Sequence, residues 1–172
     1  MRAEIRRARL GEEAAVSRLL EEVWHATHDV QLGRDKVAEI TAKWHAPALL
    51  RAQIDNPDKC FLVAEAADNS LVGHAMSWLD GDGAINLLRL YVLPGWQERG
   101  LGSNLLAAAI AAYPAGRLLR LEVQGGNEPA IRFYERMGLR VVGDTAERGG
   151  LTDIPALVME KSLPLEGGGS FS

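Results

Sequence analysis

The sequence predicts a mixed α/β fold of the α+β type, in which about seven strands form a central sheet accompanied by four helices. Three features of the 172-residue chain carry this prediction. An amphipathic helical pattern follows a first short strand, three strand-like segments joined by tight turns occupy the middle, and a strand–helix–strand unit comes next. The length suits one domain, which we expect over residues 1–165, with a glycine-rich flexible tail at 166–172.

The N-terminal third is predicted to be a strand followed by two helices. Residues 3–9 show a weak strand pattern, and residues 11–27 carry a stripe at the spacing of three and four that places side chains on one helix face. The members of this stripe are Val16, Leu19, Leu20, Val23, Trp24 and Thr27. A second helix is expected over residues 35–45; Pro47 interrupts it, and a further turn or two reaches Ile54.

The middle of the chain is predicted to be an antiparallel meander, because short polar turns separate its strand-like segments. These segments are residues 60–66, 71–79 and 84–93. A helix over residues 101–113 then leads to a strand over 118–123. The strands 84–93 and 118–123 are therefore expected to be parallel neighbours.

The last part of the chain contains one more helix and two more strands. Asn127 is a suitable N-cap for a helix over residues 128–137, and Gly138 suits the left-handed position that follows a helix. Strands over residues 139–144 and 156–163 complete the predicted sheet.

Composition excludes several classes of protein. The chain is 47% hydrophobic and has 19 basic against 23 acidic residues, a net charge of −4, which disfavours nucleic acid as the main ligand. No apolar run is long enough to span a membrane. The single cysteine, Cys60, excludes an intramolecular disulfide and a cysteine-based zinc cluster, so we expect a reducing compartment and a cytoplasmic protein.

The segment between the third meander strand and the next helix is the most informative. Gly100 and Gly102 let the backbone turn tightly where a helix begins, and unpaired amides at a helix N-terminus favour an anion. Arg99 adds a full positive charge. A P-loop is excluded because no lysine follows, and the dinucleotide fingerprint is excluded because Leu105 stands at its third glycine. A tight turn without a ligand is the alternative.

The longer pattern around this loop resembles a known family. Leu90-Tyr91-Val92, followed by Gln97-x-x-Gly100-x-Gly102, resembles the pyrophosphate-binding motif of the Gcn5-related N-acetyltransferases, the GNAT family. A second motif follows at the expected distance: Asn127-x-x-Ala130-x-x-Phe133-Tyr134-Glu135-x-x-Gly138-Leu139. The order of elements also resembles the family fold over residues 3–163.

The resemblance implies acetyl-CoA as co-substrate, an amine acceptor and no metal. Backbone groups of Leu90, Tyr91 and Val92 would pair with the pantetheine arm, to which Asn127 would also bond. The pyrophosphate would be held by the amides of Gln97, Glu98, Arg99, Gly100, Leu101, Gly102 and Ser103.

For catalysis the resemblance implies an acid and a base. Tyr134 is the candidate acid for the departing thiolate; the alternative is an aromatic on the buried face of its helix. Many family members carry a glutamate at the place of Asn86, which cannot act as a base. Glu122 is the candidate base, by its resemblance to the ribosomal-protein alanine N-acetyltransferases; alternatively it faces solvent or pairs with Arg89 or Arg120.

Four histidines lie where the resemblance implies the acceptor site: His25, His28, His45 and His74. Any of them could relay a proton near neutral pH, but we expect solvated surface histidines. The base therefore stays open between Glu122, a histidine and a water chain. His25 and His28 share a helix face at a spacing that could hold a metal, yet no third ligand is evident.

The sequence therefore predicts an N-acetyltransferase that moves an acetyl group from acetyl-CoA to a primary amine by direct attack. The acceptor is a small-molecule amine or a protein N-terminus or lysine. The alternative is a non-catalytic acyl-CoA-binding sensor or assembly module. Exposed edges at the C-terminal strands are compatible with a homodimer.

Overall fold

The computed structural model describes residues 2–148 and 155–164, so the tail expected at 166–172 lies outside the described residues. The elements follow one another as β1 (Ala3–Arg7), α1 (Glu13–Leu32), α2 (Arg34–Trp44), α3 (Pro47–Asp55), β2 (Cys60–Ala66), β3 (Leu71–Leu79), β4 (Ala84–Val92), the 3-10 helix η1 (Pro94–Trp96), α4 (Leu101–Ala111), β5 (Leu118–Val123), α5 (Glu128–Arg136), β6 (Arg140–Asp144), α6 (Thr145–Arg148) and β7 (Leu157–Ser162). None of the helices formed by these residues has the length and hydrophobicity that crossing a membrane requires.

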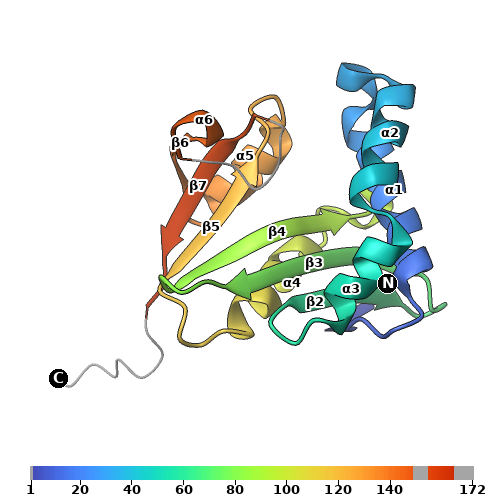
Figure 1. Cartoon of the computed structure of the whole chain (residues 1–172), viewed down its shortest axis with the longest axis horizontal. Coiled ribbons are helices and arrows are strands. Elements are labelled where there is room, and N and C mark those ends of the chain that lie inside the picture. Colours follow the sequence, from blue (N-terminus) through green and yellow to red (C-terminus); the bar gives the residue numbers. More distant parts are fainter. Residues whose placement is uncertain (1, 149–154, 165–172) are drawn as a thin grey trace. The chain divides into compact units, whose positions relative to one another are not determined.

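The described strands form one mixed sheet of seven, in the order β1-β2-β3-β4-β5-β7-β6 (Figure 1). β4 and β5 run parallel, with Ala84 opposite Leu118, as the strand–helix–strand pattern predicted. β1 pairs antiparallel with β2, and β7 pairs antiparallel with both β5 and β6. The mixed sheet expected from the sequence is thereby confirmed.

The four helical segments expected from the sequence are present, but two of them differ in extent. α1 continues to Leu32, and His28 rather than Thr27 extends its buried face. Thr27 is exposed, and its hydroxyl donates a hydrogen bond to the carbonyl of Val23 at 2.8 Å. The stripe predicted over residues 11–27 is therefore correct except at its last member.

The second expected helix is two helices. α2 ends at Trp44, and Pro47 begins α3 instead of merely interrupting one helix. A proline is well tolerated in the first turn, because its missing N–H would have no acceptor inside the helix. The one-turn helix α6 is an addition that the sequence pattern did not indicate.

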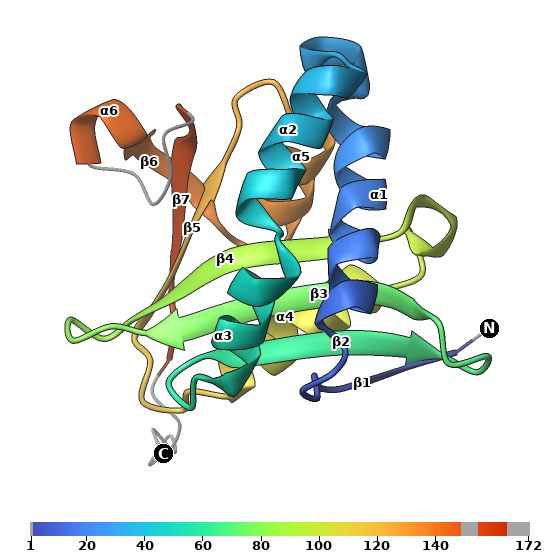
Figure 2. The same cartoon turned by 45° about the vertical axis from the view of Figure 1, so that its right-hand side comes forward.

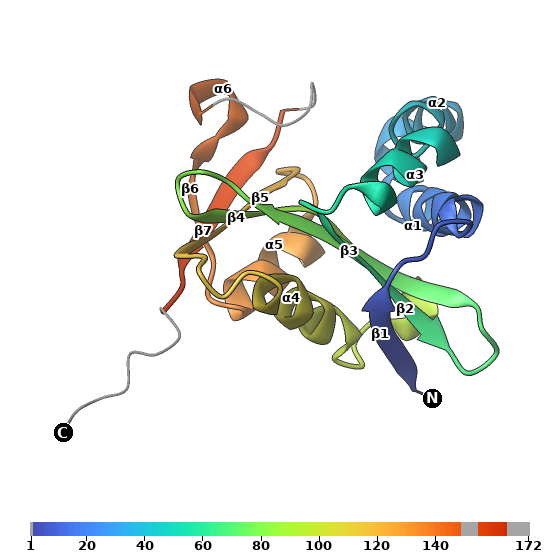
Figure 3. The same cartoon turned by 60° about the horizontal axis from the view of Figure 1, so that its bottom comes forward.

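Backbone contacts group the chain into two compact parts. The N-terminal unit contains the described residues of Met1–Met76 and Arg89–Ala109, and the C-terminal unit those of Ser77–Leu88 and Ile110–Ser172. In the N-terminal unit, α1, α2 and α3 cover one face of β2 and β3, and α4 lies on the other face (Figures 2 and 3). A Cβ atom on Gly73 of β3 would come within 2.9 Å of Leu105 of α4, so a glycine is required for this close packing.

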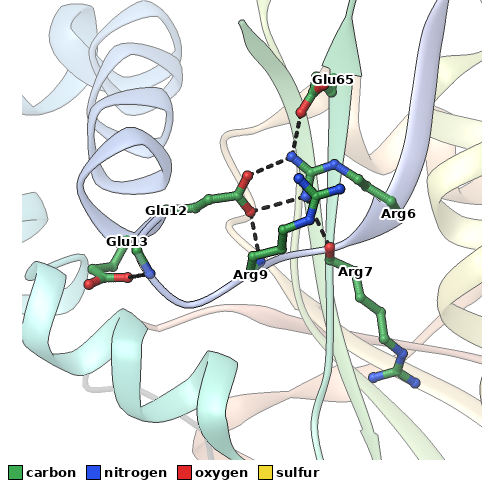
Figure 4. A network of polar contacts seen from close by, with 7 residues as sticks. Arg6, Arg7, Arg9, Glu12, Glu13 and Glu65 are labelled. Carbon is green, nitrogen blue, oxygen red and sulfur yellow. Dashed lines mark hydrogen bonds and ion pairs between the residues drawn. The ribbon is translucent and has the colours of Figure 1, made fainter. Parts of the chain in front are cut away.

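One ion-pair network in the N-terminal unit joins β1, β2 and the start of α1 (Figure 4). Arg6 donates to Glu12 through both terminal nitrogens, at 2.5 and 3.1 Å, and also pairs with Glu65. The charge and hydrogen bonds of Arg6 lower the pKa of Glu12. Arg6 thus has a carboxylate on two sides, which is the usual condition of a partly buried arginine.

The C-terminal unit shows the helix ends that the sequence predicted. The side chain of Asn127 accepts a hydrogen bond from Ala130 N at 3.4 Å, which caps α5, and Gly138 has a φ of 93° after its last turn. Lys161 of β7 donates to the carbonyl of Met137 at 2.9 Å, so a cation supplies a partner at the helix C-terminus.

Candidate functional site

The loop between β4 and α4 is held by its own hydrogen bonds. Gln97 Nε2 donates to the carbonyl of Val92 at 3.0 Å, and Leu93 N donates to the carbonyl of Val72 on β3 at 2.9 Å. Within η1, Trp96 N donates to Leu93 O at 2.8 Å. The end of β4 and the approach to α4 are therefore fixed before any ligand is considered.

The backbone of this loop turns through two left-handed residues. Glu98 has a φ of 63° and Gly100 a φ of 79°, and a Cβ atom at Gly100 would meet nothing within 4 Å. The glycine is therefore required by its backbone conformation and not by crowding. α4 begins directly afterwards, with Asn104 N donating to Gly100 O at 3.0 Å.

The start of α4 has the properties of an anion site. The first N–H groups of a helix have no carbonyl acceptor inside it, and the helix dipole adds partial positive charge there. Gly100 is exposed and Gly102 half-buried, so their backbones are accessible. The guanidinium of Arg99 lies 5.8 Å from the ring centroid of Trp96, on the same loop. A phosphate group fits this combination of amides and positive charge.

The other expected cofactor segment, Leu90–Val92, is the end of β4. Leu90 and Tyr91 are half-buried, and Val92 is buried. The hydroxyl of Tyr91 accepts a hydrogen bond from Trp24 Nε1 of α1 at 3.1 Å, which orients this side chain toward α1. The structure therefore brings the expected cofactor residues from 90 to 103 together along β4, the loop and α4 in the N-terminal unit.

The remaining expected site residues belong to the C-terminal unit. Glu122 is half-buried on β5 opposite Val158, and Asn127 caps α5. Tyr134 is buried on α5, with its ring centroid 5.3 Å from that of Phe133.

Both arginines considered as partners of Glu122 are bound to other residues. Arg120 pairs with Glu160 at 2.8 Å. Arg89 donates to the side-chain oxygen of Gln53.

Asn86 stands where the family resemblance implies a glutamate, and its amide has a structural role. It is 7% exposed, and its Nδ2 donates to Asp80 Oδ2 at 3.0 Å and to Ala84 O at 3.3 Å. The other oxygen of Asp80 accepts from Asp82 N and Ala84 N, at 2.9 and 3.0 Å. These hydrogen bonds lower the pKa of Asp80, and they form one of the short polar turns that the sequence predicts between the strands of the meander.

The expectation of solvated surface histidines is wrong for three of the four. His28, His45 and His74 are 6%, 3% and 0% exposed, and burial lowers the pKa of each, that of His45 to about 3. The sequence did not indicate this because the three lie on separate elements, whose packing buries them. His25 is half-buried and contacts Asp29 at 2.7 Å. Within the described ranges, no group of three or more histidine, cysteine, aspartate or glutamate side chains is placed to hold a metal ion.

The burial of Arg89 is the feature that the sequence did not predict. It is 5% exposed on β4, although arginine is rarely buried without an ionic partner. The signal was a single charge inside the apolar run Leu87-Leu88-Arg89-Leu90. A strand whose neighbours are buried on both faces leaves such a side chain no short path to water.

Comparison with known proteins agrees with this fold and loop. Residues 18–139 match the model of the acetyltransferase (GNAT) family. An N-acetyltransferase of Mycobacterium tuberculosis, itself uncharacterised, is 30% identical over 112 residues, covering 64% of this chain and 71% of the relative. Streptothricin acetyltransferase of Streptomyces lavendulae is 34% identical over 95 residues, 54% of this chain and 50% of the relative.

Among solved structures, PaiA N-acetyltransferase from Thermoplasma acidophilum, crystallised with coenzyme A, superposes with a TM-score of 0.80 at 25% identity. The superposition covers 95% of this chain and 100% of that one. The fold is that of the acyl-CoA N-acyltransferases. The chain belongs to the acetyltransferase (GNAT) family.

Proposed function

We propose that this chain is an acetyl-CoA-dependent N-acetyltransferase that transfers the acetyl group directly to a primary amine, in a ternary complex and without an acyl-enzyme. The observation that carries the proposal is the loop before α4, where Gly100 has a φ of 79° and exposed backbone directly precedes the helix. The relative crystallised with coenzyme A supports the same co-substrate. The catalytic domain is proposed to span residues 1–165.

Acetyl-CoA supplies the acetyl group as a thioester, and the chain binds its two polar regions. The amides from Gln97 to Ser103 hold the pyrophosphate, because they combine a helix N-terminus with the charge of Arg99. Leu90–Val92 and Asn127 bind the pantetheine arm. The Asn127 side-chain oxygen already caps α5, so its amide nitrogen is the group available to a ligand.

The acceptor amine must lose a proton before it can attack. An alkylamine with a pKa of about 10.4 is almost wholly protonated at pH 7, so freeing its lone pair costs about 4.6 kcal/mol. Glu122 accepts this proton, directly or through water. His45 is a poor candidate because its pKa is lowered to about 3. A backbone amide near Val92 stabilises the negative charge that gathers on the carbonyl oxygen, and the Tyr134 hydroxyl protonates the leaving sulfur.

The acceptor belongs to one of two classes, a small-molecule amine or a protein N-terminus or lysine. The name of the streptothricin acetyltransferase, which aligns over 54% of this chain, supports the small-molecule class. We therefore place small-molecule amines first.

A non-catalytic acyl-CoA-binding module is the second candidate. Asn86 favours it, because a neutral amide replaces a possible base and is engaged with Asp80. This candidate predicts acetyl-CoA binding without turnover.

The test is the release of free CoA from acetyl-CoA in the presence of polyamines, aminoglycosides, amino acids and short peptides. Release well above the acceptor-free rate with one class establishes the transferase and its acceptor type. If no acceptor raises the release of CoA, although calorimetry shows that the protein binds acetyl-CoA, the result contradicts the transferase proposal and favours the binding module.

A further inference from the structure

A buried arginine that pairs with no carboxylate in the described part of the chain lies on β4, on the face covered by α1–α3. Arg89 is 5% exposed, and its Nη2 donates to Gln53 of α3 and to the sulfur of Met76 at 3.1 Å. Its carbon Cζ lies 5.6 Å from the ring centroid of Phe61. The Nε and Nη1 atoms are buried and have no hydrogen-bond partner among the described residues. Two donor nitrogens of the Arg89 guanidinium therefore make no hydrogen bond with the described residues.

Two histidines, His45 and His74, lie near enough to this guanidinium for its charge to lower the pKa of their rings. His74 Nδ1 contacts the carbonyl of Leu62 at 2.7 Å, so Nδ1 carries the proton and Nε2 is an acceptor, which is buried without a partner among the residues described. His45 Nδ1 is buried in the same condition. Burial and the charge of Arg89 lower the pKa of both rings. At neutral pH both histidines are uncharged, so that among Arg89, His45 and His74 only Arg89 carries a charge.

An aromatic ring of α1 contacts two of the buried histidines. The Trp24 ring of α1 lies 4.4 Å from His28 and 5.9 Å from His45, measured between centroids, and donates to Tyr91. His28 Nδ1 is a further buried atom that lacks a described partner. The buried cluster, defined here as Arg89, His45 and His74, with His28 adjoining through Trp24, therefore has several polar atoms that the described protein does not satisfy.

Burying a cation without a partner costs free energy of folding. Proteins retain such a cation where a bound ligand supplies the opposite charge and the missing hydrogen-bond acceptors. The contrast within this chain is direct, since Arg6 contacts both Glu12 and Glu65 (Figure 4), whereas Arg89 contacts no carboxylate among the described residues. Burial lowers the pKa of Arg89 to about 10, so it remains protonated at neutral pH. The single positive charge of Arg89 is neutralised by a ligand with one negative charge. A carboxylate has one such charge, whereas a phosphate dianion has two.

We propose that Arg89 binds a carboxylate of the acceptor, so that the amine acetylated by this protein is an amino acid or a short peptide with a free C-terminus. This inference rests on the proposed function, because it assigns the acceptor of that reaction. Arg89 directly precedes Leu90–Val92 on the same strand, and its side chain faces the helices that the family resemblance assigns to the acceptor.

The test compares acceptors that differ only in the carboxylate: L-lysine against cadaverine, and glycylglycine against its C-terminal amide. We expect kcat/KM to favour the carboxylate member by about ten-fold or more, as for loss of a hydrogen bond to a charged group. In Arg89→Gln this ratio falls to near one, while Arg18→Gln, which removes an exposed arginine of α1, keeps it. Because a ratio is independent of the active fraction, partial misfolding cannot imitate the result. Equal use of both members by the wild type overturns the carboxylate assignment and leaves amine acetylation standing.

A second measurement does not depend on turnover. Thermal unfolding is followed with acetate, L-lysine, glycylglycine or inorganic phosphate, against chloride at equal ionic strength. We expect at least one carboxylate to raise Tm in the wild type and in Arg18→Gln but not in Arg89→Gln. No shift with any carboxylate, or a larger Arg89-dependent shift with phosphate, overturns the proposal. A carboxylate shift without CoA release from any acceptor upholds the Arg89 site and contradicts the transferase.

Thermal unfolding of the Arg89→Met variant in the absence of ligand separates a binding role of Arg89 from a structural one. It replaces an unpaired cation by an apolar chain of similar length, so its Tm should equal or exceed that of the wild type. A lower Tm would instead mean that Arg89 is retained for its contacts with Gln53, Met76 and Phe61, and it would contradict the binding role.

Discussion

The side-chain amide of Asn86 donates a hydrogen bond to the carboxylate of Asp80 at 3.0 Å, across the turn that joins β3 to β4. Because Asn86 is 7% exposed, this bond satisfies a polar group that could not otherwise reach water easily. The pair gives a structural role to a position at which the family resemblance implies a glutamate. Catalysis and stability can therefore be tested separately at this turn.

Asp80→Ala should destabilise the fold by about 1–3 kcal/mol, because it removes the shorter hydrogen bond of the buried Asn86 amide and two hydrogen bonds of the turn. Urea unfolding measures the loss. Asp82→Ala, at an exposed position of the same turn, is the control and should change stability little. Acetyl-CoA affinity should remain at the wild-type value in both variants; a loss of affinity in Asp80→Ala alone would contradict the purely structural role.

Gly102→Glu should abolish acetyl-CoA binding, because a carboxylate then occupies the first turn of α4, where we place the pyrophosphate. Folding should be retained, since a negative charge is favourable in the first turn of a helix. Calorimetry measures the affinity. Gly81→Glu adds the same charge at an exposed turn where a Cβ would meet nothing within 4 Å, and should bind normally. Unchanged affinity of Gly102→Glu would refute the pyrophosphate assignment.

Tyr134→Phe should lower kcat by about 10²-fold or more, as for loss of a general acid, with little change in acetyl-CoA affinity. Steady-state kinetics and calorimetry on the same preparation separate the two effects. The control is Tyr113→Phe, which removes a hydroxyl that donates to the carbonyl of Ser77 at 3.3 Å. Full activity of Tyr134→Phe would remove Tyr134 as the acid.

Glu122→Gln should remove the acid limb of the pH–rate profile. At low pH a protonated Glu122 cannot accept the proton of the amine, so the wild-type rate falls, whereas the variant has no such titration. The profile of kcat/KM against pH is the measurement, with Glu128→Gln, at an exposed position of α5, as the control. An unaltered profile would assign the proton transfer to water or to another group.

Acid should unfold the protein partly through its buried histidines. Burial and Arg89 lower the pKa of His45 to about 3 in the folded state, against about 6.5 in the unfolded chain. Between these values the unfolded state binds one more proton, so stability rises with pH and falls on acidification, by about 1.4 kcal/mol per pH unit.

His45→Gln removes this contribution, so the free energy of unfolding should depend less steeply on pH between about 6 and 4.5. Denaturant titrations at several pH values give the slope. Lys43→Gln removes an exposed charge nearby and should keep the wild-type slope. Equal slopes in His45→Gln and the wild type would show that this ring does not stay neutral in the fold.

Local features were predictable from the sequence because neighbouring residues create them. The Asn127 cap and the left-handed Gly138 depend on the backbone within one turn of α5, and both are present. The parallel pairing of β4 with β5 also followed from order alone, because a strand–helix–strand connection leaves few alternatives. The glycine loop was recognisable for the same reason, since its geometry arises within seven residues.

Burial of polar side chains was not predictable in this way, because it depends on contacts between residues far apart in the chain. Arg89 meets Gln53 across 36 residues, and His74 meets Leu62 across 12 residues. Neither partner can be inferred from periodicity, which assigns a face to a side chain but not the groups that cover it. The order of residues thus specifies the family and the glycine loop before α4. The packing of α1–α3 onto the strands buries the Arg89 guanidinium. The carboxylate site proposed for the acceptor depends on this burial.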